Sequence, residues 1–289
     1  MKISKILENN KRSLSFEVFP PKTDSSFDSV REATERIASL SPAFMSVTYG
    51  AGGGTSRYTI EIAKNIQHTY SVPTLAHLTC VSSTKETVRA RIEDMKAAGI
   101  ENVMALRGDI PVGMEDMHTE YSHAIELVRE LRQLGDDFCI GGACYPEVHP
   151  ESLSPEHDLM HLKEKVDAGL DFLTTQMFFD NELFYRFLDK ARASGIALPI
   201  IPGIMPITKA NQIERAIKLS GSYMPKRFLS LVDRFGEDSA AMTQAGIVYA
   251  TDQIIDLFAN GITNVHVYTM NKPEVAKAIL DNLSDILGK

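Results

Sequence analysis

ENVMALRGDIP, residues Glu101–Pro111, joins a short apolar run to an abrupt polar end. Val103–Leu106 is continuously apolar, which is typical of a parallel strand that is covered on both faces. Arg107, Gly108 and Asp109 follow at once, and a strand does not need such residues for packing. Because the carboxyl ends of parallel strands carry the chemistry of α/β folds, this stretch predicts where the functional site lies.

Segments of the same kind alternate with amphipathic, helix-like segments along the whole chain. Eight strands are predicted, at Leu14–Phe19, Phe44–Thr48, Thr74–Leu78, Asn102–Leu106, Cys139–Cys144, Phe172–Met177, Ile200–Ile204 and Val265–Tyr268. The helices predicted between and after them are Phe27–Leu40, Ser56–His68, Thr84–Ala98, Glu120–Leu134, Glu156–Ala168, Asn181–Ser194, Thr208–Leu219 and Pro273–Ile286. Four of these helices are followed by the C′ glycines Gly99, Gly135, Gly169 and Gly195. Ser154 and Pro155 supply an N-cap and a first-turn proline to another.

Eight βα units in succession satisfy the right-handed crossover rule most simply as a closed (β/α)8 TIM barrel. Two extra helices, Tyr223–Phe235 and Ser239–Asn260, are predicted between strands seven and eight. A doubly wound open sheet is the alternative, but it favours a glycine-rich first turn, and the first turn here is FPPKTD. The glycine run at 50–54 does not supply a dinucleotide motif, since Thr55 stands where the third glycine should be. We expect residues 1–289 to form a single catalytic barrel domain.

Composition narrows the partners and the compartment. The 289 residues carry a formal net charge of −8, which argues against nucleic acid or an anionic membrane as the main partner. The three cysteines, Cys80, Cys139 and Cys144, show no CxxC spacing, as in a reduced cytosolic protein. The start, MKISKILENN, has no apolar core of a signal peptide, and no run approaches the ~18 apolar residues of a membrane span. We therefore expect a cytoplasmic protein.

Each predicted strand ends in polar or special residues, which a barrel gathers at one mouth. In SFEVFPP, Ser15 and Glu17 point to one side of the strand, whereas Phe16 and Val18 point to the other. Apolar neighbours are expected to raise the pKa of Glu17, so that it holds a proton it can donate at neutral pH. The alternative is a structural carboxylate paired with an inward lysine or arginine.

Other strand-end residues leave alternatives open. Arg107 and Asp109 are either ligand contacts or an ion pair that closes the barrel. His77 and His149, with Asp109 and Glu17, carry metal-binding groups, but neither HxH nor HExxH spacing supports a metal site.

The helix after the fifth strand carries a polar stripe. Asp158, His161 and Lys165 are spaced i, i+3, i+7 and so share one face. On this segment alone, a solvated helix face is the favoured interpretation.

Taken together, these motifs resemble the methylenetetrahydrofolate reductase family. The matching strings are SFEVFPPK, SVTYGAGGG, AHLTC, ALRGDIP, YPEVHPE, KVDAGLDFLTTQMFFD, IIPGIMP and VHVYTMN, which span nearly the whole chain. The resemblance implies a (β/α)8 barrel that holds non-covalent FAD at its mouth and reduces 5,10-methylenetetrahydrofolate to 5-methyltetrahydrofolate, the methyl source for methionine synthesis. NADH or NADPH is the implied electron donor, and a protein donor such as ferredoxin is also compatible. It further implies a homo-oligomer, dimer or tetramer, of the bacterial type that lacks the eukaryotic regulatory domain.

The resemblance also assigns roles to residues. Glu17 matches the family's catalytic acid, and Asp109 matches the aspartate beside the flavin and the folate. Gln176 and Gln212 match residues that bind the folate. The matches to flavin contacts are Thr48, His77, Arg107, Gly108, Asp109, Tyr145, His149, Asp158, His161 and Lys165. Two positions depart from the family pattern: Lys272, at the folate's benzoyl-glutamate, where arginine is common, and Ser122, near the adenosine half, where alanine is common.

The implied mechanism is a ping-pong reaction. Glu17 acts as a general acid on N10, which opens the imidazolidine ring to a 5-iminium cation, and Asp109 stabilises this cation and tunes the flavin. Two alternatives remain: a metal-dependent barrel lyase or hydrolase that uses His77, His149 and Asp109, and a non-catalytic folate-binding subunit.

Overall fold

The computed structural model describes residues 1–9, 11–21, 23–49, 56–81, 83–110, 120–135 and 137–288. Within these ranges nine strands form one parallel sheet in the order β7-β6-β5-β4-β3-β2-β1-β9-β8. The strands are β1 (Ser13–Val18), β2 (Met45–Val47), β3 (Thr74–Thr79), β4 (Asn102–Leu106), β5 (Cys139–Cys144), β6 (Phe172–Thr175), β7 (Ile200–Ile201), β8 (Gly203–Ile204) and β9 (Asn264–Tyr268).

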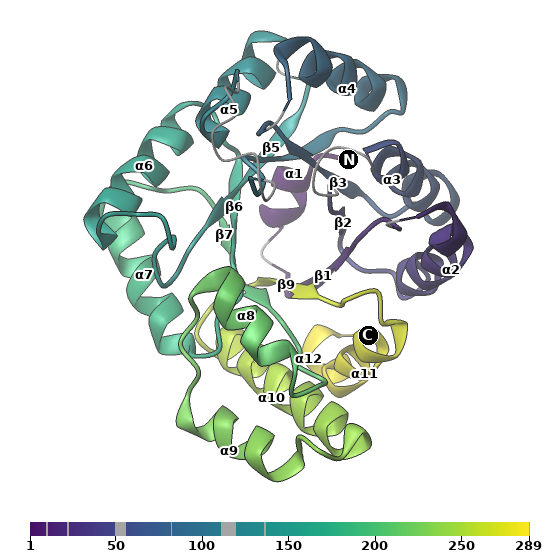
Figure 1. The fold of residues 1–289 in the computed structure, drawn as a ribbon, viewed down its shortest axis with the longest axis vertical. Helices are drawn as coiled ribbons and strands as arrows, with labels where there is room; N and C mark the ends of the chain where they lie inside the picture. Colours follow the sequence, from purple (N-terminus) through teal and green to yellow (C-terminus); the bar gives the residue numbers. More distant parts are fainter. Residues whose placement is uncertain are drawn as a thin grey trace.

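Helices surround this sheet in a ring (Figure 1). The helices that follow successive strands are α2 (Phe27–Ala38), α3 (Ser56–Tyr70), α4 (Lys85–Ala97), α5 (Ala124–Gln133), α6 (Pro155–Asp167) and α7 (Asn181–Ala193). The long crossover before β9 holds α8 (Gln212–Ser220), α9 (Lys226–Phe235) and α10 (Ser239–Ala259), and the chain ends with α11 (Pro273–Asn282) and α12 (Ser284–Leu287). A short helix, α1 (Ile3–Leu7), precedes β1, and a 3-10 turn, η1 (Asp24–Ser26), precedes α2.

The two outer members of the strand order, β7 and β8, are separated only by Pro202. β7 pairs with β6, and β8 pairs with β9, so the segment at 200–204 joins both ends of the sheet. Proline has no N–H to donate, which interrupts the ladder, while the Pro202 carbonyl still accepts from His266 N at 2.9 Å. The predicted (β/α)8 barrel is therefore confirmed, with its seventh strand recorded as two short pieces.

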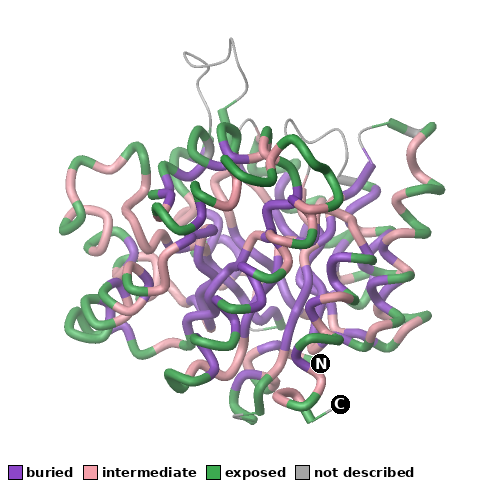
Figure 2. The backbone as a smooth tube through the Cα atoms, turned by 90° about the horizontal axis from the view of Figure 1, so that it is seen from below, coloured by how far each residue is buried: buried purple, intermediate pink, exposed green. Residues whose placement is uncertain are grey.

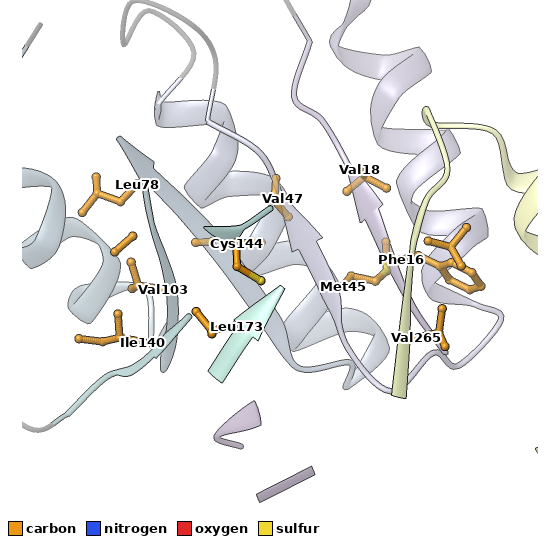
Figure 3. Close-up of a cluster of buried hydrophobic side chains, with 14 of the residues drawn as sticks. Phe16, Val18, Met45, Val47, Leu78, Val103, Ile140, Cys144, Leu173 and Val265 are labelled. Carbon is orange, nitrogen blue, oxygen red and sulfur yellow. The ribbon is translucent and has the colours of Figure 1, made fainter. Parts of the chain in front are cut away.

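Side chains alternate between two layers across the barrel wall. The outward layer packs against the helices, and Figure 3 shows part of it, including Phe16, Val47, Val103 and Leu173. The inward layer at the bottom of the barrel is also apolar and is closed by Ile3 and Leu7 of α1, which Figure 1 shows inside the ring of strands. Figure 2 shows the buried strands at the centre and the exposed helix faces around them.

The remaining differences from the sequence prediction lie at element ends and in α1. The glycines expected after four helices all have positive φ, and Ser154 caps α6 as predicted. The helix predicted from Thr208 begins instead at Gln212, whose side-chain Oε1 accepts from the Thr208 and Lys209 backbone N–H groups and so closes a turn there. The final predicted helix is divided at Leu283 into α11 and α12, and α1 was not predicted. The glycine run at 50–54 lies outside the described residues.

Candidate active site

The carboxyl ends of the strands converge on a cavity of about 450 Å³, which we call the mouth cavity. Three residues predicted to handle the substrate, Glu17, Asp109 and Gln176, all line it, from β1, the β4 end and the β6 end. The other predicted site residues that line the mouth cavity are Thr48, His77, Arg107, Gly108, Tyr145, His149 and Lys165. The barrel thus brings Glu17 and Gln176, which are 159 positions apart in the chain (176 − 17), into the wall of one cavity.

Glu17 lies among polar partners rather than apolar ones. Its carboxylate Oε2 accepts from Ser46 Oγ at 3.1 Å and lies 3.9 Å from His266 Nε2. Burial alone would raise the pKa of Glu17, but the nearby His266 and His77 rings and the hydrogen bond from Ser46 outweigh it and lower that pKa. The predicted rise is therefore wrong, because inward polar residues of β2, β3 and β9 solvate the carboxylate.

His77 faces the same carboxylate from β3. Its Nε2 lies 3.6 Å from Glu17 Oε2, and its side chain is 10% exposed. Burial lowers the pKa of His77, and the neighbouring Glu17 charge offsets only part of this effect. His77 thus contributes a mainly neutral ring to the wall of the mouth cavity.

The Arg107–Gly108–Asp109 turn holds its two charged side chains in different settings. Arg107 makes a bidentate ion pair with Glu151, which differs from the Arg107–Asp109 pair considered as one alternative, and Asp109 is exposed. Gly108 has φ +88°, and a Cβ there would lie 2.9 Å from Thr79 Cβ, so both conformation and space require glycine. The turn therefore presents to the mouth cavity a carboxylate that has no ion-pair partner among the described residues.

A second cavity of about 760 Å³, the side groove, runs between α5 and α6. It shares Arg107, Tyr145, His149 and Lys165 with the mouth cavity, so the two adjoin each other. Burial raises the pKa of the Tyr145 phenol to about 12 and lowers that of His149, so both rings are neutral at pH 7.

The predicted polar stripe of α6 lies along this groove, and only His161 within it is exposed to solvent, with a side chain that is 54% exposed. Asp158, His161 and Lys165 all line it. Lys165 Nζ donates to the Ala143 carbonyl at 2.6 Å, and burial lowers the pKa of its ammonium. An ammonium has three donors, so Lys165 can also serve a ligand.

Two buried polar atoms that line these cavities have no hydrogen-bond partner within the described residues. One is Thr174 Oγ1 in the mouth cavity, and the other is His157 Nδ1 in the side groove. Buried polar groups are nearly always satisfied, so each atom points to a bound molecule or water as its partner. Together the cavities suit an elongated ligand with polar groups in both parts.

Three predicted site residues line neither cavity. Ser122 lies just before α5, where its backbone N–H donates to the Glu126 carboxylate. Lys272 Nζ donates to Thr208 Oγ1, which also lies 3.3 Å from Gln212 Oε1. Lys272 and Gln212 are thus brought together, but beside the mouth cavity rather than in its wall.

Sequence reasoning missed the residues behind Glu17. His266 of β9 is 2% exposed and bonds through its ring nitrogens to Ser15 Oγ at 2.7 Å and Ser46 Oγ at 3.0 Å. The signal was present, since His266 alternates with Val265 and Val267 and so had to face inward. It was not predicted because the predicted site residues lie at strand ends, whereas His266 lies within a strand.

No group of three or more His, Cys, Asp or Glu residues suited to a metal ion occurs in the part of the chain that the structure describes. Across the same residues, none of the helices has the length and apolar character to span a membrane.

A closed parallel barrel whose carboxylates and histidines gather at its carboxyl mouth defines the class as a (β/α)8 barrel with its ligand site in the usual place. The sequence profile of methylenetetrahydrofolate reductase matches residues 2–284. The chain belongs to the methylenetetrahydrofolate reductase family.

Individual relatives agree with this assignment. The chain is 37% identical over 273 residues to 5,10-methylenetetrahydrofolate reductase of Pectobacterium carotovorum, covering 94% of this chain and 90% of that protein. It is 36% identical over 271 residues to the enzyme of the same name from Escherichia coli, with the same shares covered. It is also 37% identical to methylenetetrahydrofolate reductase (NADH) 1 of Arabidopsis thaliana, over 98% of this chain but 50% of that protein. The chain therefore spans about half the length of its plant relatives.

Solved structures support the fold. A Clostridium thermocellum protein that binds two copies of 5-methyl-5,6,7,8-tetrahydrofolic acid superimposes with a TM-score of 0.70 at 17% identity, covering 100% of this chain and 99% of that one. A Xanthomonas albilineans dihydropteroate synthase superimposes with a TM-score of 0.53 at 15% identity, covering 96% and 92% of the two chains.

Proposed function

We propose that this protein reduces 5,10-methylenetetrahydrofolate to 5-methyltetrahydrofolate with FAD and a nicotinamide donor, and that residues 1–289 act as one catalytic domain. The observation that carries the proposal is the meeting of Glu17, Asp109 and Gln176 in one cavity that adjoins a groove lined by the buried ammonium of Lys165. Membership of the family and the names of the bacterial relatives support it.

FAD suits the two cavities. A flavin ring would occupy the mouth cavity, and the adenosine half would follow the side groove, where His157 Nδ1 lacks a partner in the described structure. Lys165, held in the floor between the two cavities, would serve the pyrophosphate with its remaining donors. When bound, FAD supplies hydride chemistry that no side chain provides.

The protein's own residues would activate the folate. We assign Glu17 the transfer of a proton to N10, which opens the five-membered ring and leaves a 5-iminium cation ready to accept hydride. The exposed carboxylate of Asp109 would stabilise that cation across the mouth cavity. Gln176 Oε1 accepts from Met177 N at 2.9 Å, and its amide N–H groups, which have no acceptor among the described residues, would orient the pterin.

NADH is the donor we favour, because the plant relatives carry it in their names. With a single mouth cavity available to both substrates, NADH would react first and leave before folate enters, which is ping-pong behaviour. Steady-state rates measured at several fixed folate concentrations should give parallel double-reciprocal lines.

The variant Glu17→Gln tests the assignment of the acid. It keeps the shape of the side chain but cannot donate a carboxyl proton, so folate turnover should fall about 10²- to 10⁴-fold. Flavin content and flavin reduction by NADH should stay at wild-type levels, because neither needs this proton. Normal turnover of methylenetetrahydrofolate by the variant would show that Glu17 is not the acid.

A further inference from the structure

His266 is the centre of a buried polar chain behind Glu17. Its ring stacks on Phe44, with ring centroids 5.6 Å apart and an angle of 9° between the planes, so both nitrogens are held in fixed directions. Ser15 Oγ lies 2.7 Å from Nδ1, and Ser46 Oγ lies 3.0 Å from Nε2. Ser46 Oγ also lies 3.1 Å from Glu17 Oε2 and is therefore the bridge between the ring and the carboxyl group.

Hydrogen counting links the protonation of the two ends. Ser46 has one hydroxyl proton. When Glu17 is ionised, that proton points to the carboxylate, so Ser46 Oγ accepts from His266 and Nε2 carries a proton. When Glu17 is protonated, the carboxyl donates to Ser46, whose own proton turns to Nε2, and Nε2 must then be bare. Ser15 Oγ donates its one proton to the Val265 carbonyl at 3.3 Å, so Nδ1 carries a proton and donates to Ser15 in both states. The ring is therefore an imidazolium while Glu17 is ionised, and neutral once Glu17 is protonated.

We infer that His266 is a positioning residue that stores a proton for Glu17 and delivers it through Ser46 when substrate covers the mouth cavity. In this step the Nε2–H bond breaks as a proton passes to Ser46 Oγ, and Ser46 releases its own proton to Glu17 Oε2. His266 loses one positive charge, Glu17 loses one negative charge, and Ser46 is unchanged. This inference rests on the proposed function, since it supplies the proton that folate N10 consumes.

Burial gives the step its direction. Glu17 has an 18% exposed side chain, whereas that of His266 is 3% exposed, so a ligand over the mouth desolvates the carboxylate far more than the ring. Loss of water favours the neutral carboxyl group, which draws the proton outward.

Two other side chains near Glu17, His77 and Tyr268, are less suited to supply this proton. His77, from β3, lies 3.6 Å from the carboxylate and keeps a lowered pKa through burial. Tyr268, from β9, is held neutral because burial raises its pKa well above the usual range. Its ring meets the edge of the His266 ring at a centroid distance of 5.4 Å.

The first test needs no folate. In protein with ¹⁵N-labelled histidine, nitrogen chemical shifts report which ring nitrogen of His266 is protonated, and a His266→Gln spectrum assigns the signals. At neutral pH, Nε2 should carry a proton in the wild type and in the control Ser15→Ala, which keeps the bridge. In Ser46→Ala, which removes the acceptor for Nε2–H, that proton should be lost. A wild-type ring with either nitrogen bare, or a protonated Nε2 in Ser46→Ala, overturns the inference.

The second test uses the flavoprotein and follows folate reduction after NADH reduction. Ser46→Ala should slow this half-reaction by up to about 10²-fold and shift the falling limb of its pH profile to lower pH. The plot of rate against the deuterium fraction of the solvent, curved in the wild type, should become straight in this variant. Ser15→Ala should keep the wild-type limb. A purely structural role of Ser46 would lower thermal stability and leave the limb in place, which would overturn the inference. A wild type that accepts electrons but never reduces methylenetetrahydrofolate would refute the proposed function instead, and the nitrogen shifts would still decide the relay.

Discussion

Replacing Lys165 by methionine should weaken FAD binding without weakening the fold. The ammonium is buried in the ligand-free protein, where burial lowers its pKa and where it donates to the Ala143 carbonyl at 2.6 Å. Methionine loses that hydrogen bond but also removes a desolvated charge. These two effects on the stability of the apoprotein oppose each other, so we expect a net change of under about 1 kcal/mol.

The effect of Lys165→Met on FAD binding has no opposing gain of this kind. A charge-assisted hydrogen bond to a phosphate contributes about 1.5–3 kcal/mol, which corresponds to about a 10- to 150-fold rise in Kd when it is lost. Titration of apoprotein with FAD, followed by flavin fluorescence, measures Kd, and thermal unfolding of the apoprotein measures stability. The matched control is Lys163→Met on the same helix, because Lys163 pairs with Asp167 and lines neither cavity. An unchanged Kd for Lys165→Met, or an equal loss for both variants, would refute the assignment of Lys165 to the pyrophosphate.

Two further predictions concern stability. In Gly246→Ala on α10, the new Cβ would lie 1.7 Å from the Ile207 carbonyl oxygen, so overpacking of about 1–3 kcal/mol should exceed the ~0.5–1 kcal/mol gain in helix propensity. Urea unfolding of Gly246→Ala should show net destabilisation. The control Val248→Ala, at a 54% exposed site on the same helix, should change the stability little. A more stable Gly246→Ala would show that α10 does not lie so close to the Ile207 carbonyl. The second prediction is a loss of stability in acid. His77 and His149 have pKa values lowered by burial from 6.5, so as pH falls through 6.5 the unfolded chain binds more protons than the folded protein and stability falls. The free energy of unfolding measured between about pH 7 and pH 5 should decline less steeply in His77→Gln than in the wild type, and equal slopes would contradict the burial of a neutral His77.

Local pattern was enough to predict the barrel. β4 has the predicted bounds because its apolar run ends sharply at Arg107, and β5 likewise has its predicted bounds. The inward direction of Glu17 followed from the period of two along β1. The pattern did not reveal that the Gln212 side chain accepts from the backbone N–H of Thr208 and closes a turn there. The predicted start of this helix was therefore four residues early (212 − 208).

The electrostatics of the site could not be predicted in the same way. The partners of Glu17 come from β2, β3 and β9, and the pairing of β1 with β9 places His266 opposite Ser15, 251 positions away. No local window contains such a contact. The sequence alone therefore suggested an apolar setting and a raised pKa for Glu17, whereas hydrogen bonds from distant strands lower it. Likewise, Glu151 is the partner of Arg107, and its role became visible only when the β5–α6 loop was placed beside the β4 end.

The most direct measurement is the visible absorption spectrum of the purified protein under anaerobic conditions, before and after two additions. The proposed function predicts a flavin band that NADH bleaches and that 5,10-methylenetetrahydrofolate then restores, with 5-methyltetrahydrofolate formed in equal amount. A protein that binds no flavin when FAD is supplied, or a bleached flavin that methylenetetrahydrofolate leaves reduced, would contradict it.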